Sequence, residues 1–144
     1  MHKIHGEWEI SVIRQIIVRS TAGVFNEEGT LAAFKEFQEK APITAPWAGL
    51  TNAENWEMSS AGSLQRISAM RDWAFAHQCQ ALAIVMPNKL KKKIYQTQTG
   101  EFGEDKVAYF FELAQACEWL TGKGFAISVD EYPHRDFIAR TKPA

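Results

Sequence analysis

The chain alternates short stretches of strand-like hydrophobic pattern with longer stretches of helical pattern. Residues 7–12 alternate polar and apolar side chains, with Trp8, Ile10 and Val12 on one face, which predicts a strand with one buried side. A second run, rich in β-branched residues, begins at Ile16. Because the gap between the two runs is short, they are predicted to form an antiparallel hairpin.

Helical periodicity recurs along the rest of the chain. Asn26 is a suitable N-cap for a first helix, and the acidic residues after it favour the positive end of the helix dipole. The predicted helices cover residues 26–40, 60–78, 89–99 and 113–122, and the further strands cover residues 47–51, 81–86 and 107–110. The expected inward positions are Leu31, Phe34 and Phe37 in the first helix and Leu64, Ile67, Met70 and Ala74 in the second.

Strands separated by helices imply right-handed crossovers and a mainly parallel sheet, with the hairpin at one edge. The uninterrupted apolar run at residues 81–86 is typical of a strand buried on both faces. Residues 52–58 are more polar and are expected to form a loop. The fold class predicted from this order is α/β.

The C-terminal part of the chain is expected to be an addition to this fold. We divide the sequence into a domain over residues 1–124 and an extension over residues 125–144. Alternation of Phe125, Ile127 and Val129 predicts an added edge strand, and the residues after it are expected to be loosely attached. An exposed strand there would allow pairing across a two-fold axis into a homodimer.

Composition excludes several classes of protein. The 144 residues correspond to about one domain, and 16 Lys and Arg against 17 Asp and Glu argue against a nucleic-acid binder. Cys79 and Cys117 are too few for a disulfide scaffold and sit in apolar surroundings, so buried thiols are expected. Without an apolar leader or a membrane-length apolar run, the expected location is cytoplasmic.

No motif in the sequence predicts catalysis or a bound cofactor. The four histidines include no metal-binding spacing, and neither a nucleophile elbow nor a glycine-rich phosphate loop is present. We therefore expect a protein that is not an enzyme and that uses neither a cofactor nor a metal ion.

Three stretches give the chain a resemblance to a known family. Residues 17–29 contain G-x-F-N-E-E-G at the entry to the first helix, and residues 47–54 form an apolar strand that ends in an acidic segment. Residues 107–120 are similar to a closing pattern v-x-x-F…A-x-x-W-L. Together they resemble uncharacterised bacterial proteins of the STAS/SpoIIAA-like (STAS/SEC14) type. The resemblance implies a single-domain SpoIIAA-like sandwich with a mixed, mostly parallel sheet, an N-terminal β-hairpin and flanking helices.

The same resemblance points to a regulatory serine. In the antagonist branch of the family, a serine at the start of the second helix accepts phosphate from a partner kinase, in a pattern like D-S-S-G-L. This chain has M-S-S-A-G-S-L at residues 58–64, so Ser59 and Ser60 are phosphoacceptor candidates. Free N–H groups at a helix N-terminus favour a phosphate there. The competing interpretation is an ordinary N-cap serine, because Met58 replaces the aspartate and Ala61 separates serine from glycine.

Two further groups of residues are candidates for a ligand or partner surface. The densest charge run consists of Lys89, Lys91, Lys92 and Lys93, which form either a solvated helix face or a patch for anionic headgroups or an acidic partner. Trp56, in the expected loop, and Trp73, on the second helix, either fill the core or share an apolar pocket. The leading hypothesis is a non-enzymatic regulatory or interaction module that binds a protein partner or a small apolar ligand. The alternative is a lipid or membrane-surface protein of the SEC14-like type.

Overall fold

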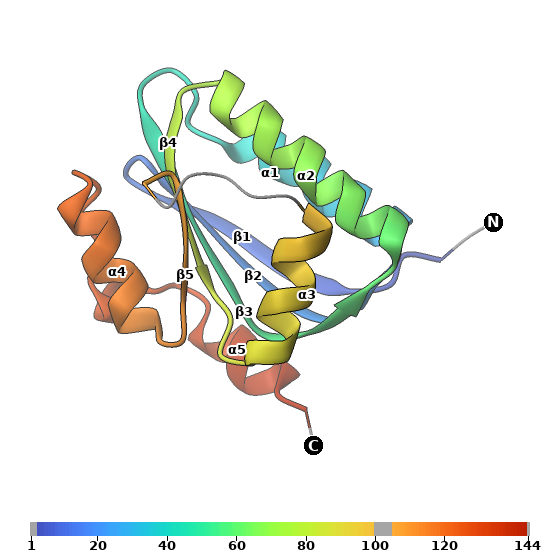
Figure 1. Cartoon of the computed structure of the whole chain (residues 1–144). Helices are drawn as coiled ribbons and strands as arrows, with labels where there is room; N and C mark the ends of the chain where they lie inside the picture. The colour runs from blue at the N-terminus through green and yellow to red at the C-terminus, as the bar shows by residue number, and fades with distance from the viewer. Residues whose placement is uncertain (1–2, 100–104, 144) are drawn as a thin grey trace.

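Five strands form one sheet in the order β1-β2-β3-β4-β5, shown in the computed structural model of Figure 1. The structure describes residues 3–99 and 105–143. The strands are β1 (Glu7–Ile13), β2 (Ile16–Phe25), β3 (Trp47–Ser59), β4 (Cys79–Val85) and β5 (Val107–Phe110). The helices are α1 (Glu27–Lys40), α2 (Ala61–Ala76), α3 (Lys89–Thr99), α4 (Leu113–Gly122) and α5 (Arg135–Thr141), with a 3₁₀ turn, η1 (Val129–Glu131).

The pairing of the strands confirms the mixed, mostly parallel sheet. β1 and β2 are antiparallel, and Ile13 faces Ile16 across a turn made by Arg14 and Gln15. Arg14 adopts a φ of 54°, a left-handed conformation that a tight hairpin of this kind requires. The pairs β2–β3, β3–β4 and β4–β5 are parallel. β3 is therefore the central strand, as its apolar start at Trp47 predicts.

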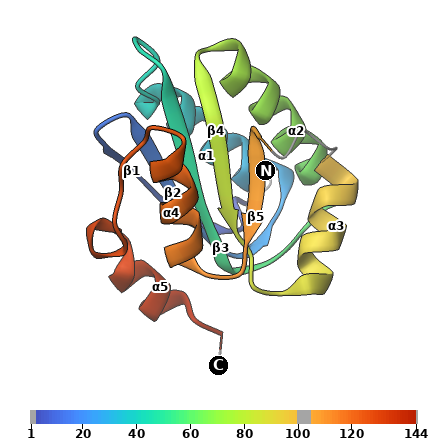
Figure 2. The ribbon, with the colours of Figure 1, turned by 60° about the vertical axis from the view of Figure 1, so that its left-hand side comes forward.

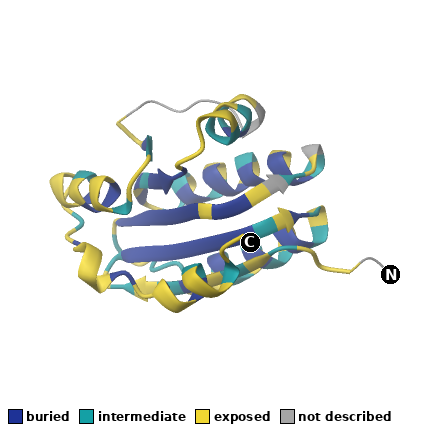
Figure 3. Ribbon diagram, turned by 90° about the horizontal axis from the view of Figure 1, so that it is seen from below, coloured by how far each residue is buried: buried dark blue, intermediate teal, exposed yellow. Residues whose placement is uncertain are grey.

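Helices cover both faces of the sheet. Figure 2 shows α1, α2 and α3 on one side, and α4 and α5 on the other. Each face has its own buried core: Ile17 and Trp47 contribute to the α1–α2 side, whereas Val18 and Leu50 contribute to the α4 side. The buried strands between these layers are visible in Figure 3. Adjacent residues of a strand thus serve different layers, as the two-residue period requires.

The local signals at the helix starts act as expected. The Asn26 side chain accepts a hydrogen bond from the Gly29 N–H at 2.8 Å, and Ser60 accepts one from the Ser63 N–H at 3.2 Å. The buried stripe expected for α2 is confirmed. The stripe expected for α1 is partly wrong: Leu31 is exposed, and the helix buries Gly29, Thr30, Ala33 and Phe37. Small residues bring the start of α1 close to its neighbours.

The loop expected at residues 52–58 is wrong, because β3 continues through it to Ser59. Beside β2, the partners change from Ser20↔Asn52 to Ala22↔Asn55, which inserts one extra residue into β3. A second shift follows between Gly23 and Val24. Bulges of this kind interrupt the alternation of faces that marks a strand in a sequence.

Residues 125–129 do not form the expected edge strand, and the tail is not loose. After α4 the chain passes through η1 and returns across the sheet to end in α5. Tyr132, His134 and Phe137 are buried in this segment, and Tyr132 belongs to the core under α4. The homodimer based on such a strand therefore has no support in the described part of the chain.

Candidate functional site

A cavity lies between the sheet and the helices of the α1–α2 side. It has a volume of about 410 Å³, part of it open to solvent. Strands β2 and β3 form its floor, and α1, α2 and α3 supply its walls. The lining residues are Arg19, Thr21, Phe25, Thr30, Ala33, Thr51, Ala53, Trp56, Ser59, Ile67 and Tyr95. Aromatic and aliphatic side chains thus surround a few hydroxyl groups and a single described charge. Its lining resembles that of small-molecule pockets, which are mostly apolar with a few polar groups.

The charge belongs to Arg19, whose side chain is only 8% exposed. Arg19 is in the middle of β2 and faces the helices, as Ile17 does two residues earlier. Its Nη1 donates to the Met70 sulfur at 3.1 Å, and its Nε has no hydrogen-bond partner. Burial lowers the pKa of the guanidinium, because a charged group is less stable away from water.

An adjoining cavity of about 330 Å³ shares Arg19, Thr51 and Tyr95 with the first. Arg71, from α2, lines this second cavity and donates from Nη2 to the Tyr109 hydroxyl at 2.7 Å. The Arg71 guanidinium also lies over the Tyr95 ring, 5.2 Å from its centroid. Both cavities are therefore lined by the Arg19 guanidinium, and the smaller one also by that of Arg71.

The bulges in β3 place Trp56 in the cavity wall. Thr51 and Ala53 face the cavity at odd positions, and the extra residue between Asn52 and Asn55 changes the parity. Trp56 therefore points to the same side and is buried, while Asn55 faces α5 and donates to the Ile138 carbonyl at 2.8 Å. The Trp56 indole N–H donates to the Ser59 hydroxyl at 2.9 Å.

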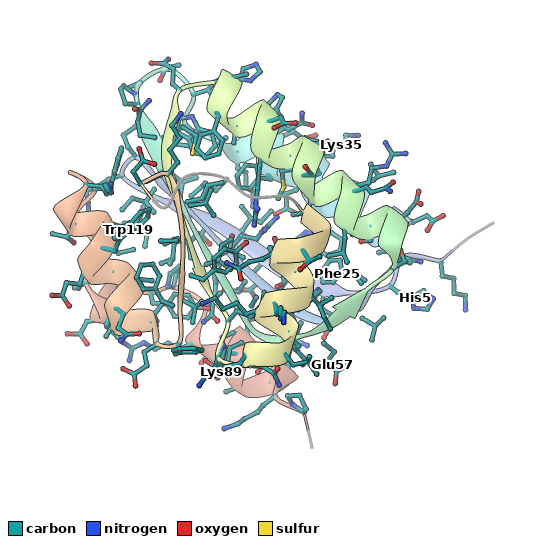
Figure 4. The ribbon with its side chains drawn as sticks, viewed as in Figure 1. His5, Phe25, Lys35, Glu57, Lys89 and Trp119 are labelled. Atoms are coloured by element: carbon teal, nitrogen blue, oxygen red, sulfur yellow. The ribbon has the colours of Figure 1, made fainter. Side chains whose placement is uncertain are left out.

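Helix α3 covers one side of the cavity. Tyr95 packs edge-on against Trp56, with ring centroids 5.6 Å apart. At the start of the same helix, Lys91 donates from Nζ to the Trp56 carbonyl at 3.0 Å. Figure 4 labels Phe25, at the end of β2, and Lys89, at the first turn of α3. α3 is thus attached to β3 by one aromatic contact and one hydrogen bond.

The lysines of the charge run do not share one environment. Lys91 points inward, as its hydrogen bond shows, whereas Lys89 and Lys93 are exposed. Lys89 and Lys92 both lie over the ring of Phe111, at 5.9 and 5.5 Å from its centroid. The lysine patch of α3 therefore consists of the exposed Lys89 and Lys93 and the half-buried Lys92.

Trp73 does not join Trp56. It lies near the other end of α2, packs against Phe37 and Trp47, and stacks on His77 with centroids 4.5 Å apart. Trp73 thus belongs to the aromatic core between α1, α2 and the sheet. The hypothesis that both tryptophans share one pocket has no support in these contacts, while Trp56 alone lines a cavity.

The two candidate serines have different roles in the fold. Ser60 is exposed and caps α2, whereas Ser59 accepts the indole hydrogen bond of Trp56 and lines the cavity. The N-cap interpretation therefore describes Ser60. Phosphorylation of either serine stays a prediction.

The sequence did not indicate a buried polar cluster on the opposite face. His134, 2% exposed, meets the Ser20 hydroxyl at its Nδ1 and the Ser11 hydroxyl at its Nε2, both at 2.8 Å. Ser20 also hydrogen-bonds with Tyr132. Although a serine beside a histidine resembles a nucleophile and base, Ser20 is fully buried beneath Tyr132. The cluster therefore joins the C-terminal segment to the sheet.

Both cysteines are free and buried, as expected. Burial raises the pKa of the Cys79 thiol to about 12 and also raises that of Cys117. Within residues 3–99 and 105–143, three or more potential metal ligands nowhere come together. The helices described there are also too short or too polar to cross a membrane.

Arg19 is the site residue that sequence reasoning missed. The signal that could have identified it is a charged residue inside the β-branched run at residues 16–21. That run forms β2, which lies between β1 and β3 in the sheet.

One solved structure supports the fold. It is the crystal structure of an uncharacterized protein from the DUF3478 family with a SpoIIAA-like fold, from Shewanella loihica PV-4. The two chains are 14% identical, the match covers 83% of this chain and 98% of that one, and the TM-score is 0.61. No protein-family model and no curated protein matches the sequence. The chain therefore has the SpoIIAA-like fold that the sequence resemblance implies.

Proposed function

We propose, from the SpoIIAA-like fold and the cavity beneath its helices, that this chain is a STAS-type interaction module that binds a small apolar molecule. The observation that carries the proposal is the cavity of about 410 Å³ enclosed by Phe25, Trp56, Ile67 and Tyr95. Apolar walls are unfavourable surroundings for water. An apolar ligand that displaces this water therefore binds favourably.

The residues that line the cavity are suited to binding a molecule and not to catalysing a reaction. The described lining residues include no histidine or carboxylate beside the hydroxyl groups, which come from Thr21, Thr30, Thr51, Ser59 and Tyr95. A nucleophile needs such a base to be activated. Hydroxyl groups on an apolar wall instead orient a bound molecule.

Nuclear magnetic resonance titration with 1-octanol tests the proposal. We expect saturable shifts of the Trp56 indole and Ile67 methyl signals in the wild type. Ala53→Phe, which extends a ring into the cavity from β3, should weaken octanol binding at least about tenfold, because the space is filled. Ala126→Phe, outside the lining, is the matched control and should bind as the wild type does. Shifts absent from the cavity residues at saturating octanol would contradict the proposal.

A second candidate function is contact with an anionic bilayer surface. Leu90 is 69% exposed and Phe111 43% exposed, and they neighbour the lysine patch of Lys89, Lys92 and Lys93. Apolar side chains among lysines match an interface of acyl chains and anionic headgroups. Each lysine near such a surface contributes roughly 1 kcal/mol.

Sedimentation with lipid vesicles tests this second candidate. We expect binding to phosphatidylglycerol vesicles at low salt, loss of binding at high salt, and loss in the Lys89→Glu/Lys92→Glu/Lys93→Glu variant. Lys35, on the exposed surface of α1 (Figure 4), gives the control Lys35→Glu, which should bind normally. Equal sedimentation of the triple variant and the wild type would exclude the α3 patch as the bilayer contact.

A further inference from the structure

We propose that the ligand of the cavity is a carboxylate with an apolar body, and that Arg19 is its counter-charge. The inference rests on the proposed function, because it names the chemistry of the molecule that would occupy the same cavity.

The first step is the unbalanced charge of Arg19. Arginine keeps its proton in proteins, so the buried side chain is a cation even though burial lowers its pKa. Its described surroundings include the Met70 sulfur, at 3.1 Å, the face of Phe37, 5.8 Å from the ring centroid, and the Tyr95 hydroxyl, which accepts a hydrogen bond from the guanidinium. No ion pair to a described carboxylate accompanies them. Removing an ion from water without a partner of opposite charge costs several kcal/mol.

The second step is the free hydrogen-bonding capacity of the guanidinium. Arg19 Nε is fully buried and has no acceptor, which is the only such side-chain atom among the described residues. Arg19 lines both adjoining cavities, so its guanidinium lies at the boundary between them. A buried donor without an acceptor is rare in native proteins and marks a position that another group fills.

The third step is the composition of the walls. Among the described lining residues of the two cavities, none is acidic, while Arg71 adds a second cation to the smaller one. No described carboxylate in the lining of either cavity would repel an anion. The planar fork of one guanidinium matches the two oxygens of one carboxylate.

The remaining wall selects the body of the ligand. Beyond Arg19, the larger cavity continues between Phe25, Ile67 and Trp56. These side chains favour a hydrocarbon chain or ring and disfavour a sugar or a nucleotide. The ligand class is thus an apolar monocarboxylic acid, and an eight-carbon acid serves as its probe.

Paired titrations with octanoate and 1-octanol at pH 7.5 test the inference, because the two probes share a chain and differ in charge. We expect Arg19→Met to weaken octanoate binding about ten- to hundredfold, the range for a hydrogen bond to a charged group. Octanol affinity should change less than about threefold, since methionine keeps the apolar stem. Arg66→Met, an exposed arginine on α2, is the control and should leave both affinities unchanged.

The outcomes separate the two proposals. If neither probe binds the wild type, the proposed function fails. If octanol binds but Arg19→Met leaves octanoate affinity unchanged, the cavity stands and the carboxylate inference is overturned. Octyl phosphate binding more tightly than octanoate would also overturn it, in favour of a phosphate. Should Arg19→Met not fold, Arg19→Lys provides the same comparison, with an expected intermediate loss for octanoate because lysine lacks the fork.

Discussion

Arg19 places a positive charge in the interior, where it does not stabilise the protein without a ligand. Its side chain, on the helix-covered face of β2, contacts Met70 and Phe37, and its Nε has no acceptor. A residue kept for stability alone would be apolar at this position. The proposed carboxylate ligand accounts for the charge.

Substituting Arg19 should make the unliganded protein more stable. We expect Arg19→Met to raise the free energy of unfolding by about 1–3 kcal/mol, because a buried charge is replaced by a side chain of similar length. Urea denaturation of ligand-free protein measures the change, and Arg66→Met should leave the midpoint unaltered. A loss of stability in Arg19→Met would indicate that the guanidinium is already satisfied without a ligand.

Two glycines within helices should respond to alanine in opposite ways. A Cβ at Gly29, in α1, would lie 2.0 Å from the His5 carbonyl oxygen, whereas a Cβ at Gly122, in α4, would meet open space. Alanine normally stabilises a helix relative to glycine by up to about 1 kcal/mol. We expect Gly122→Ala to be neutral or stabilising.

Gly29→Ala should be destabilising by 1 kcal/mol or more, at about the size of other overpacking substitutions. Thermal unfolding of the two variants provides the comparison. Equal stabilisation by both substitutions would mean that residue 5 does not contact the start of α1.

At the level of single elements, β3 shows where sequence reasoning ends. Its first residues, from Trp47 to Thr51, read correctly as a central strand, because both faces are buried and apolar. The next residues, 52–58, are polar and break the two-residue alternation, since bulges shift the faces. Asn52 and Asn55 are buried because they bind Tyr132 and α5, elements distant in the sequence. The sequence around Asn52 and Asn55 does not indicate these contacts.

The C-terminal segment should detach as the pH falls. Burial lowers the pKa of the His134 imidazole, Lys40 acts in the same direction, and Glu9, 3.8 Å from Nε2, opposes them more weakly. The unfolded chain therefore binds a proton that the folded chain resists, so stability rises with pH across this interval. It is fully present above about pH 6.5 and declines as the pH drops towards the lowered value.

Hydrogen exchange of the α5 amides between pH 7.5 and 5.5 measures this effect, after correction for the intrinsic pH dependence of exchange. We expect protection of α5 to fall with pH in the wild type, while protection of β3 changes little. His134→Gln should remove most of that dependence. An α5 protection factor that stays constant over this range would contradict the role of His134.

The loss of stability in strong acid has a separate cause. The Arg14 guanidinium holds the pKa of the Glu131 carboxyl at about 2, through a contact of 2.8 Å. The stability from this exposed pair is present above the ordinary pKa of a glutamate, near 4.5, and is lost as the pH falls towards 2. Arg14→Met should thus affect stability above pH 4.5 and not in strong acid.

At the scale of the whole molecule, the hydrophobic periodicity of the sequence predicts the layers of helices and sheet but not the cavity between them. The order of elements, the N-terminal hairpin and the stripe of α2 follow from local patterns, and the solved structure with a SpoIIAA-like fold supports the same architecture. The cavity lies where the side chains of α1, α2 and α3 do not fill the space above β2 and β3. That gap depends on how the helices pack together and not on the pattern within any one of them. Of the lining residues, Trp56 and Ser59 are candidates from the sequence, each because of its position in the chain.

The central claim is that a small apolar carboxylate occupies the cavity beside Arg19. Intermolecular nuclear Overhauser effects between carbon-13-labelled octanoate and the protein test it most directly. The account predicts contacts from the chain methylenes to the Trp56 indole, the Ile67 methyls and the Tyr95 ring, all of which line the cavity. Contacts confined to Leu90 and Phe111, on the surface, would contradict it.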